Sequence, residues 1–491
     1  MILYICGHNF RYELENICRL FFPFEKITVS DTTEQSDGRS VTAIRTTENG
    51  ETVLTVTFDD GNIHKADSRT VNSLADGFDD ECERLFAVML YGIFSEYTGT
   101  QPKWGILTGV RPGKLMRRMA DSEGEENARR WFTEKLLVSD EKVDLALAAS
   151  RTEQSIINLS RPDSFSLYVS VPFCPTRCSY CSFVSHSVEQ AKKLIEPYTE
   201  LVCKEIAYTG EIAQKLGLHL ETVYIGGGTP TAISAEQLGR IMSAVNGSFD
   251  LSACREFTVE AGRPDTVTDE KLDAIMKNGA TRISINPQTM CNAVLENIGR
   301  CHTAEQTVTA FEMARKHGFN NINMDLIAGL PGDTYEIFCD TMKKIIALDP
   351  ESVTVHTLSM KRSSRMTTGG DLPDAEVGKT ADCMLRHAKS VLAEVGMRPY
   401  YLYRQSRTVG NLENTGFAKP GYEGLYNIYI MDETHSILAC GASAVTKLRA
   451  TDGYIERIFN YKYPYEYTDR FEEIINRKLG IEKFYDSHPV K

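Results

Sequence analysis

The sequence of 491 residues lacks any stretch that approaches the ~18 consecutive apolar residues of a membrane-spanning helix. Its first residues also lack the basic segment and the long apolar run of a secretory signal, so we expect a cytoplasmic protein without membrane association. Repeats at solenoid periods and low-complexity tracts are absent as well. The composition, with 42% apolar and 25% charged residues, is that of a globular chain of roughly two to four domains.

Basic residues are in deficit, because 54 Lys and Arg face 67 Asp and Glu and give a net charge of −13. A generic nucleic-acid coat is therefore disfavoured, although a local basic pocket is not excluded. The one basic stretch we single out, Arg111–Arg118, is either a solvated helix start or an anion or RNA contact. The 13 cysteines are an odd number without a secretion signal, which argues against a disulfide framework and for a reducing compartment.

The apolar pattern predicts three parts, residues 1–160, 161–396 and 397–491. The first is expected to be an α+β domain of unknown role, with a strand at Ile2–Ile5 and a hairpin within Val41–Phe58. The last, rich in Tyr and Gly, is expected to be a small, partly β region that covers the substrate.

The middle part alternates short apolar strands with amphipathic helices. Six strands are expected, at Phe165–Val171, Thr222–Ile225, Glu256–Glu260, Arg282–Ile285, Asn321–Ile327 and Ser352–Leu358. Serial βα units form a parallel sheet, and eight would close a full barrel. We therefore expect an α/β fold built on a partial (β/α)6 TIM-like barrel.

Three cysteines follow the first of these strands with the spacing C-x3-C-x2-C, at Cys174, Cys178 and Cys181. On a loop at the carboxyl end of a barrel strand, thiolates this close in sequence can face one point. Sulfur ligands suit an iron–sulfur cluster or zinc. Three cysteines on a 4Fe-4S cluster leave one iron open to a small molecule, whereas His186 would close a Cys3His zinc site.

Glycine and polar residues follow the next strands. The second strand leads into the run 226–229, Gly-Gly-Gly-Thr, where backbone can approach a ligand closely. No Gly-Lys-Ser/Thr follows it, so the run is not a phosphate-binding P-loop. Glu260 ends the third strand, Gln288 follows the fourth and Asp325 lies in the fifth. Barrel enzymes build their sites at this end of the strands, so the positions indicate one site.

The cysteine spacing, the glycine loop and the strand-ending Glu together resemble the radical S-adenosylmethionine (SAM) superfamily. Within it the chain resembles the oxygen-independent coproporphyrinogen III oxidase (coproporphyrinogen dehydrogenase) branch, in a variant with an extra N-terminal domain. The resemblance covers about residues 165–365. It implies a 4Fe-4S cluster and SAM as cofactors, radical chemistry from the cleavage of SAM, and an electron donor such as flavodoxin or ferredoxin.

The resemblance also implies roles for single residues. Cys174, Cys178 and Cys181 would ligate the cluster. Residues that would bind SAM are Tyr168, Gly227, Gly228, Thr229, Glu260, Gln288, Arg300 and Asp325. Of these, Tyr168 and Gln288 would also serve in catalysis. The implied reaction is the oxidative decarboxylation of coproporphyrinogen III to protoporphyrinogen IX in haem biosynthesis.

The chain departs from the family patterns at three places. Phe183 stands where the best-known oxidases carry a fourth cysteine, and the haem-chaperone relatives also have Phe there. The chaperones carry a His-Asn-x-x-Tyr-Trp motif, and the nearest stretch here, Tyr426–Ile430, lacks its His and Trp. Glu260–Pro264 reads Glu-Ala-Gly-Arg-Pro, so the Asn-Pro half of a Glu-Ala-Asn-Pro motif is not intact.

Two alternatives therefore stay open beside the oxidase. One is a haem chaperone or a haem-modifying methyltransferase of the same branch. The other is a radical SAM enzyme acting on RNA through Arg111–Arg118, and the lack of a second cysteine triplet weighs against it.

A substrate with four carboxylates needs a cationic anchor. Lys361, Arg362 and Arg365 follow the sixth strand, and we expect them on the same rim as the cluster, unless they form a solvated loop. Arg263 and Arg404 are candidates to join them. An aromatic run, 399–403, is either core or a cover for an apolar macrocycle.

Overall fold

The computed structural model describes residues 1–32, 38–48, 51–72, 77–183, 186–361, 364–369 and 375–489. The chain forms two compact units, Met1–Leu147 with Arg404–Leu412, and Ala148–Tyr403 with Glu413–Lys491. The three-part division with boundaries at 160 and 396 stays a prediction. In the described ranges, no helix is long and apolar enough to span a membrane.

The first unit is built on a mixed five-stranded sheet in the order β2-β1-β3-β4-β5. Its strands are β1 (Ile2–Cys6), β2 (Thr28–Ser30), β3 (Ser40–Glu48), β4 (Glu51–Asp59) and β5 (His64–Asn72). Strand β1 and the β3–β4 hairpin lie where the sequence predicts them. Leu54, Val56 and Phe58 alternate on β4 and are fully buried, and the Phe58 ring meets Phe94 edge-on at 5.5 Å. This alternation makes one face of the sheet apolar.

Helices complete the first unit and lead out of it. They are α1 (Arg11–Phe21), α2 (Phe78–Thr98), α3 (Pro112–Glu123), α4 (Glu125–Arg130), the π-helix Trp131–Lys135 and α5 (Asp140–Ile157). The basic stretch Arg111–Arg118 begins just before α3, whose first residue is a proline. Proline suits this position because its missing N–H has no partner there in any case.

The second unit contains the six predicted parallel strands. They are β6 (Ser164–Val171), β9 (His219–Gly227), β10 (Glu256–Glu260), β11 (Arg282–Ser284), β12 (Ile322–Ala328) and β13 (Ser352–Thr357). Each pairs in parallel with the next in chain order. Their carboxyl ends therefore share one edge, and the α/β expectation is confirmed.

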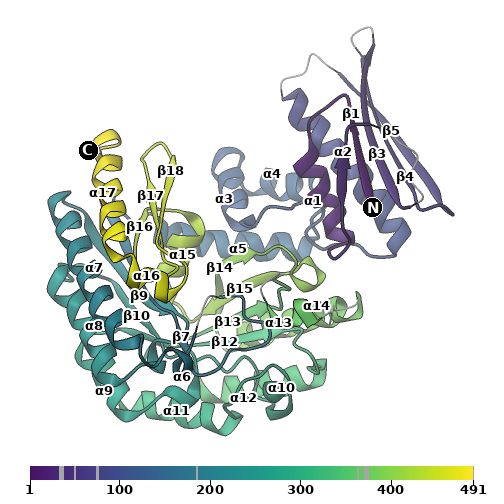
Figure 1. Cartoon of the computed structure of the whole chain (residues 1–491). Helices are drawn as coiled ribbons and strands as arrows, with labels where there is room; N and C mark the ends of the chain where they lie inside the picture. Colours follow the sequence, from purple (N-terminus) through teal and green to yellow (C-terminus); the bar gives the residue numbers. More distant parts are fainter. Residues whose placement is uncertain are drawn as a thin grey trace. The chain divides into compact units, whose positions relative to one another are not determined.

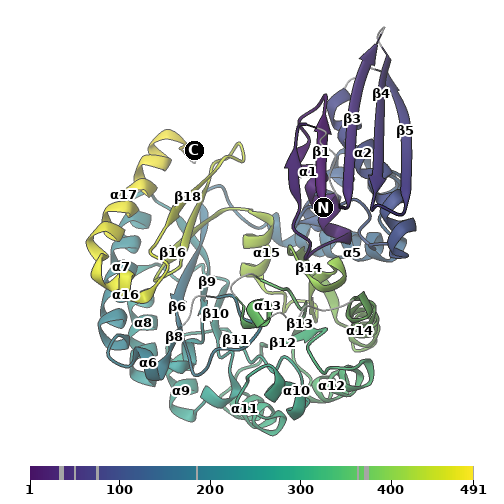
Figure 2. The ribbon, with the colours of Figure 1, turned by 45° about the vertical axis from the view of Figure 1, so that its right-hand side comes forward.

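Helices between the strands cover the outer face of this sheet (Figures 1 and 2). The larger ones are α7 (Ile195–Lys215), α8 (Ala235–Ser248), α9 (Asp269–Lys277), α11 (Ala304–Lys316), α12 (Tyr335–Leu348) and α14 (Ala375–Glu394). Their starts are encoded locally. Ser234 and Thr303 form capping boxes, and the Thr268 side chain accepts from the amide of Lys271 as expected.

The C-terminal part of the chain extends both edges of the same sheet. Strand β15 (Glu413–Ala418) pairs antiparallel with β13, and β14 (Arg398–Arg404) lies outside it. At the other edge β16 (Ser436–Cys440) pairs in parallel with β6, followed by β17 (Val445–Arg449) and β18 (Ile455–Phe459). The result is one sheet of 11 strands.

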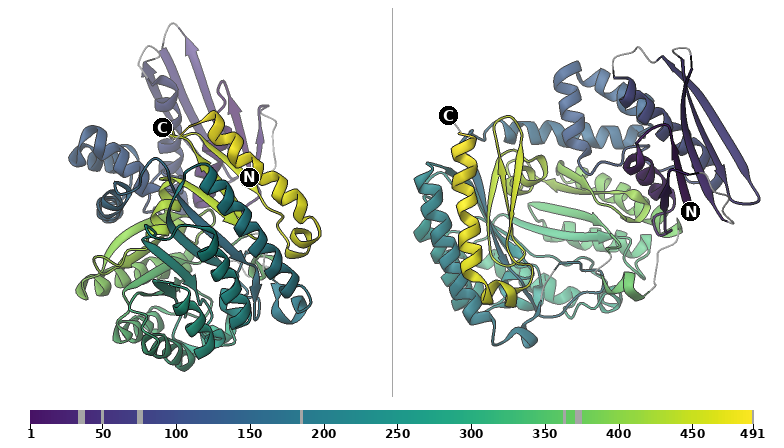
Figure 3. Two further views of the ribbon diagram at one scale, coloured as in Figure 1. Left: turned by 90° about the vertical axis from the view of Figure 1, so that its left-hand side faces the viewer. Right: turned by 45° about the horizontal axis from the view of Figure 1, so that its top comes forward.

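Three C-terminal helices accompany these strands. They are α15 (Leu425–Asp432), α16 (Pro464–Asp469) and α17 (Phe471–Ser487). Helix α17 lies along α7 (Figure 3). Short helices at the carboxyl ends of the parallel strands are α6 (Val188–Ala191), α10 (Asn292–Asn297) and α13 (Arg365–Gly369).

Candidate functional site at the carboxyl ends of the parallel strands

The cysteine loop follows β6 and is fixed by its backbone. Cys174 ends the short strand β7 (Phe173–Cys174), which pairs with β8 (His186–Ser187). The amide of Ser179 donates to the carbonyl of Ile298 at 3.0 Å, which ties the loop to the end of α10. Cys178 is buried, whereas Cys174 and Cys181 are half-buried.

The three thiols do not form a preassembled metal site. Within the part of the chain that the structure describes, no three His, Cys, Asp or Glu side chains meet as ligands would. Burial raises the pKa of the Cys181 thiol to about 11, so the ligand-free thiol is neutral. Three thiols on one short loop nonetheless fit the donor set of an iron–sulfur cluster, because metal binding deprotonates and gathers its ligands. The His186 ring packs instead against Tyr463 and Tyr465, at 6.4 and 6.1 Å.

The glycine loop after β9 packs directly on the cysteine strand. Gly227 has φ of +108°, which L-residues rarely adopt, and a Cβ on Gly228 would lie 2.6 Å from the carbonyl oxygen of Phe173. The amide of Thr229 donates to that same carbonyl at 2.8 Å. The Thr229 hydroxyl lies 3.5 Å from the Cys174 sulfur. The predicted glycine residues and the first cysteine are therefore neighbours.

Three tyrosines form a stack beside this loop. Tyr168 of β6, Tyr224 of β9 and Tyr426 of α15 lie nearly parallel, with the Tyr224 and Tyr426 centroids 4.5 Å apart. The Tyr224 hydroxyl donates to the carboxylate of Glu260. The sequence predicts Tyr168 as a site residue but not the other two. Tyr224 precedes the glycine run by two residues and so shares its face of the strand, which is a signal that sequence reading can use.

The pKa values of Glu260 and Asp325 are shifted in opposite directions. Burial raises the pKa of Glu260 to about 7, and the nearby Asp325 adds to the rise. Burial also disfavours the charged form of Asp325, but hydrogen bonds from His356 and Asn323 outweigh it and lower its pKa. The Asn323 amide lies 2.7 Å from Asp325 Oδ1. At pH 7 Glu260 is therefore about half protonated, while Asp325 is ionised.

Gln288 and Arg300 carry buried polar atoms that find no partner among the described residues. These atoms are Gln288 Oε1 and Arg300 Nε. Gln288 has φ of +68° and is held by its backbone, with its amide donating to the carbonyl of Asp325 at 2.9 Å. The Arg300 guanidinium donates to the carbonyl of Asn286 at 2.7 Å. Unsatisfied buried groups are rare, and a polar ligand would satisfy them.

The predicted substrate anchor is only partly described. Arg362 lies outside the described residues. Lys361 and Arg365 are described, and the amide of Met366, the residue after Arg365, donates to the carbonyl of Ser179 in the cysteine loop at 3.2 Å. The segment is therefore next to the predicted cluster.

Two expectations about arginines change. Arg404 is buried in the first unit, where its guanidinium donates to the carbonyl oxygens of Leu107 and Asn411. At least two of its N–H groups are therefore directed at backbone of that unit. Arg263 is also buried and is turned toward the cysteine loop, 3.1 Å from the Thr176 hydroxyl.

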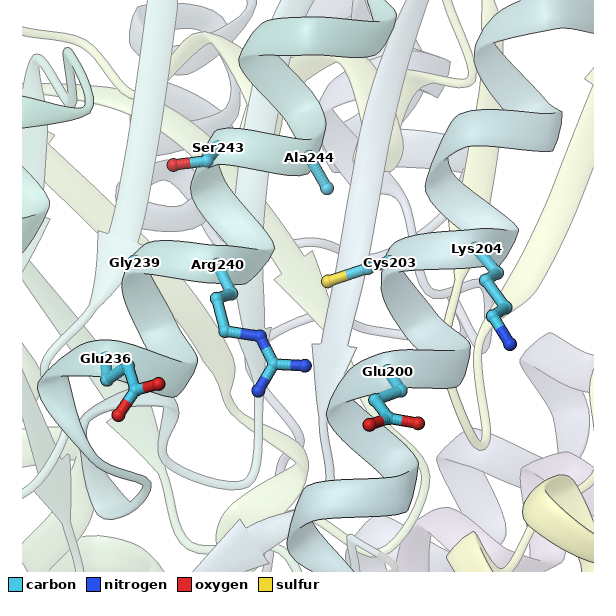
Figure 4. A pocket seen from close by; sticks show the side chains of 8 residues that line it. All are labelled: Glu200, Cys203, Lys204, Glu236, Gly239, Arg240, Ser243 and Ala244. Atoms are coloured by element: carbon cyan, nitrogen blue, oxygen red, sulfur yellow. The ribbon is translucent and has the colours of Figure 1, made fainter.

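A hollow of about 700 Å³ lies elsewhere, between α7 and α8 (Figure 4). Glu200 and Cys203 of α7 and Arg240 of α8 are among its lining side chains. None of the predicted site residues lines it. The burial of Cys203 raises its pKa, so its thiol is a poor nucleophile.

Comparison with known proteins places this geometry in a family. Residues 168–345 match the Radical SAM superfamily. The oxygen-independent coproporphyrinogen-III oxidase-like protein HemZ of Bacillus subtilis is 40% identical over 404 residues, which cover 81% of each chain. The haem chaperone HemW of Lactococcus lactis is 35% identical, covering 58% of this chain and 70% of its own.

A solved structure supports the fold. Coproporphyrinogen III oxidase (HemN) from Escherichia coli has a TM-score of 0.51 at 23% identity, covering 65% of this chain and 72% of its own. The cofactors of the superfamily are a 4Fe-4S cluster and SAM, and the thiols and unpartnered polar atoms described above fit them. The chain belongs to the radical SAM superfamily, in the branch of oxygen-independent coproporphyrinogen III oxidase-like proteins.

Proposed function

We propose that this chain converts coproporphyrinogen III to protoporphyrinogen IX without oxygen, as a radical SAM oxidoreductase of haem biosynthesis. The observation that carries the proposal is the hydrogen bond from the amide of Met366 to the carbonyl of Ser179, because Met366 directly follows Arg365 and Ser179 belongs to the cysteine loop. Carboxylates bound by Lys361, Arg362 and Arg365 would hold the substrate at the mouth of the SAM site.

The cofactors would be held by the residues that the family resemblance indicates. Cys174, Cys178 and Cys181 would ligate the cluster. SAM would contact the glycine loop with Thr229, the side chains of Glu260 and Asp325, and the unpartnered atoms of Gln288 and Arg300. When bound, the two cofactors would supply a hydrogen-abstracting organic radical. An electron donor such as flavodoxin or ferredoxin would deliver the reducing electron.

The chain itself orients the reactants and excludes water. The stack of Tyr168, Tyr224 and Tyr426 would shield the reacting centre from solvent, and Tyr168 would lie against SAM. Glu260 would be only partly ionised near pH 7 and would accept the Tyr224 hydroxyl when ionised, so that Asp325 carries the one full negative charge of this carboxyl pair. Two of the four substrate propionates would each lose one hydrogen atom to the radical, then carbon dioxide, and pass one electron to an external acceptor, which leaves two vinyl groups and two intact propionates.

A haem chaperone is the second candidate function, because relatives with that name match 58% and 65% of this chain. The family resemblance also implies a Phe in the chaperones at the position of Phe183. Phe183 is 68% exposed. In the stretch nearest the chaperone motif, however, Tyr426 is stacked on Tyr224 at 4.5 Å rather than presenting a histidine. That geometry favours the oxidase.

The test is an anaerobic assay of the protein reconstituted with iron and sulfide, reduced and given SAM with coproporphyrinogen III. We expect 5′-deoxyadenosine and protoporphyrinogen IX to appear together by mass spectrometry. Deoxyadenosine without protoporphyrinogen, together with stoichiometric haem binding, would favour the chaperone. Deoxyadenosine with neither would overturn both and return attention to RNA and Arg111–Arg118.

A pair of variants tests the anchor. The double variant Lys361→Ala/Arg365→Ala should reduce porphyrinogen turnover by about tenfold or more for each charged hydrogen bond to the substrate that it removes, while SAM cleavage without substrate is unchanged. Lys277→Ala, an exposed lysine on α9 that is 76% accessible, is the matched control. Equal turnover in both variants would remove segment 361–365 from the substrate site.

A further inference from the structure

Arg263 has a position that neither the substrate nor SAM explains. It follows β10 in the stretch that departs from the Glu-Ala-Asn-Pro motif, and only 3% of its surface is exposed. Its Nη1 lies 3.1 Å from the Thr176 hydroxyl and 3.9 Å from the Cys178 sulfur. The guanidinium thus reaches the middle and most buried of the three cysteines.

Asp265 holds the orientation of this guanidinium on the side opposite Nη1. Nε and Nη2 of Arg263 donate to the two carboxylate oxygens of Asp265, each at 3.1 Å. Such a bidentate pair fixes the guanidinium plane and leaves Nη1 as the remaining arm of the fork. That arm is the one that meets Thr176 and Cys178.

A second arginine, Arg300, follows α10 and is held by backbone. Its guanidinium donates to the carbonyls of Asn286 and Gly262, at 2.7 and 3.3 Å. Arg263 instead directs Nη1 at the Cys178 sulfur.

We propose that Arg263 is a positioning residue that donates a hydrogen bond to the Cys178 thiolate of the cluster and thereby raises the cluster's reduction potential. Reduction adds negative charge to the cluster, and hydrogen bonds and positive charge at its sulfurs stabilise that charge. Asp265 lies on the far side of Arg263 and offsets part of the effect without removing the donor. The inference concerns the cluster alone and does not depend on the substrate.

The experiment is a redox titration of the reconstituted cluster, followed by electron paramagnetic resonance in the absence of SAM. Arg263→Gln removes the charge, so we expect a more negative potential and a smaller reduced fraction at any fixed poise. Arg263→Lys keeps a charge but cannot bond Asp265, Thr176 and Cys178 together, so a smaller shift in the same direction is expected.

The control is Thr176→Val, which removes the hydroxyl that Nη1 contacts and leaves the Thr176 backbone carbonyl, Arg263 and Cys178 intact. Its potential should match the unaltered protein. An unchanged potential in Arg263→Gln at full iron content would overturn the proposal, as would an equal shift in Thr176→Val. If Arg263→Gln does not bind a cluster, the redox titration of Arg263→Lys takes its place. An unchanged reduction potential in Arg263→Lys would then overturn the proposal.

Discussion

Two regions of the second unit bury charged side chains, and they satisfy them differently. Where α7 meets α17, Glu205 is fully buried and lies 3.0 Å from the equally buried Lys478. Tyr467 and the amide of Gly441 each donate to Glu205 at 2.7 Å, as does Asn460. Each of the two carboxylate oxygens of Glu205 therefore has two partners: Oε1 has Lys478 and Asn460, and Oε2 has Tyr467 and Gly441.

The second region is the carboxyl-end rim of the parallel strands, where Glu260, Gln288, Arg300 and Asp325 lie, and its hydrogen bonding is less complete. Gln288 Oε1 and Arg300 Nε lack partners in the described ranges. The neighbouring carboxyls of Glu260 and Asp325 have pKa shifts of opposite direction. Gln288 also holds a backbone conformation that costs energy. A buried network whose polar groups are all hydrogen-bonded stabilises the fold. A buried group without a partner destabilises it and is available to bind a ligand. The comparison predicts that variants in the first region change stability and those at the rim change function.

The largest effect is expected at the cysteines. Cys178→Ala should abolish iron binding and SAM cleavage, while the ligand-free chain keeps its melting temperature within a few degrees, since the loop is held by backbone bonds at Ser179. Iron content, 5′-deoxyadenosine and a thermal melt report the outcome. Cys203→Ala, half-buried on α7, is the control and should keep full cleavage. Persistent cleavage in Cys178→Ala would refute the cluster assignment.

In the buried network between α7 and α17, Glu205→Gln should lower the unfolding free energy by about 3–5 kcal/mol, because it leaves the Lys478 charge buried without its counter-ion. Urea unfolding measures this. Glu205→Gln/Lys478→Met removes both charges and should recover part of the loss. Turnover per folded molecule should stay unchanged in both. A double variant no more stable than the single one would show that the loss does not come from the unpaired Lys478 charge.

Much of this rim is local in origin and could be predicted from the sequence. Each of the six strands was visible as a short apolar run, and parallel pairing brings their carboxyl ends to one edge. The cap at Thr268 follows from its own side chain. Glu260 at the end of its strand, Gln288 after the next and Asp325 within the following one needed only these places for the sequence to predict that they share one site.

What the sequence did not show depends on contacts between distant segments. Tyr426 reaches the stack from α15, some 200 residues beyond Tyr224, and no period in the sequence reports that contact. The same holds for β16, which pairs with β6 across the chain. Arg263 was a candidate for the substrate anchor, and its sequence position did not reveal that Asp265, two residues later, directs its guanidinium to the cysteine loop.

An intermediate effect is expected from Glu260. Its pKa of about 7 lies above the ordinary value of 4.5, so the folded chain holds a proton that the unfolded chain releases between these pH values. Its contribution to stability is therefore full below pH 4.5 and lost as pH rises to 7, by at most about 3 kcal/mol. Glu260→Gln should flatten the pH dependence of urea unfolding between pH 5 and 8. Glu270→Gln, an exposed carboxylate with a lowered pKa, should leave the slope as it is.

The smallest effect isolates the strain at Gln288. A φ of +68° destabilises a non-glycine residue by about 1 kcal/mol, whereas glycine adopts it without this strain. Gln288→Gly and Gln288→Ala both lose the side chain, so both should lose SAM cleavage, but only glycine relieves the backbone. The glycine variant should therefore be about 1 kcal/mol more stable than the alanine variant in urea. Because the backbone here is held by Asp325 and Ile327, relaxation cannot remove the strain in the alanine variant. If alanine proved the more stable, the strain would not be real, and the rim would differ from the Glu205 region only in its missing partners.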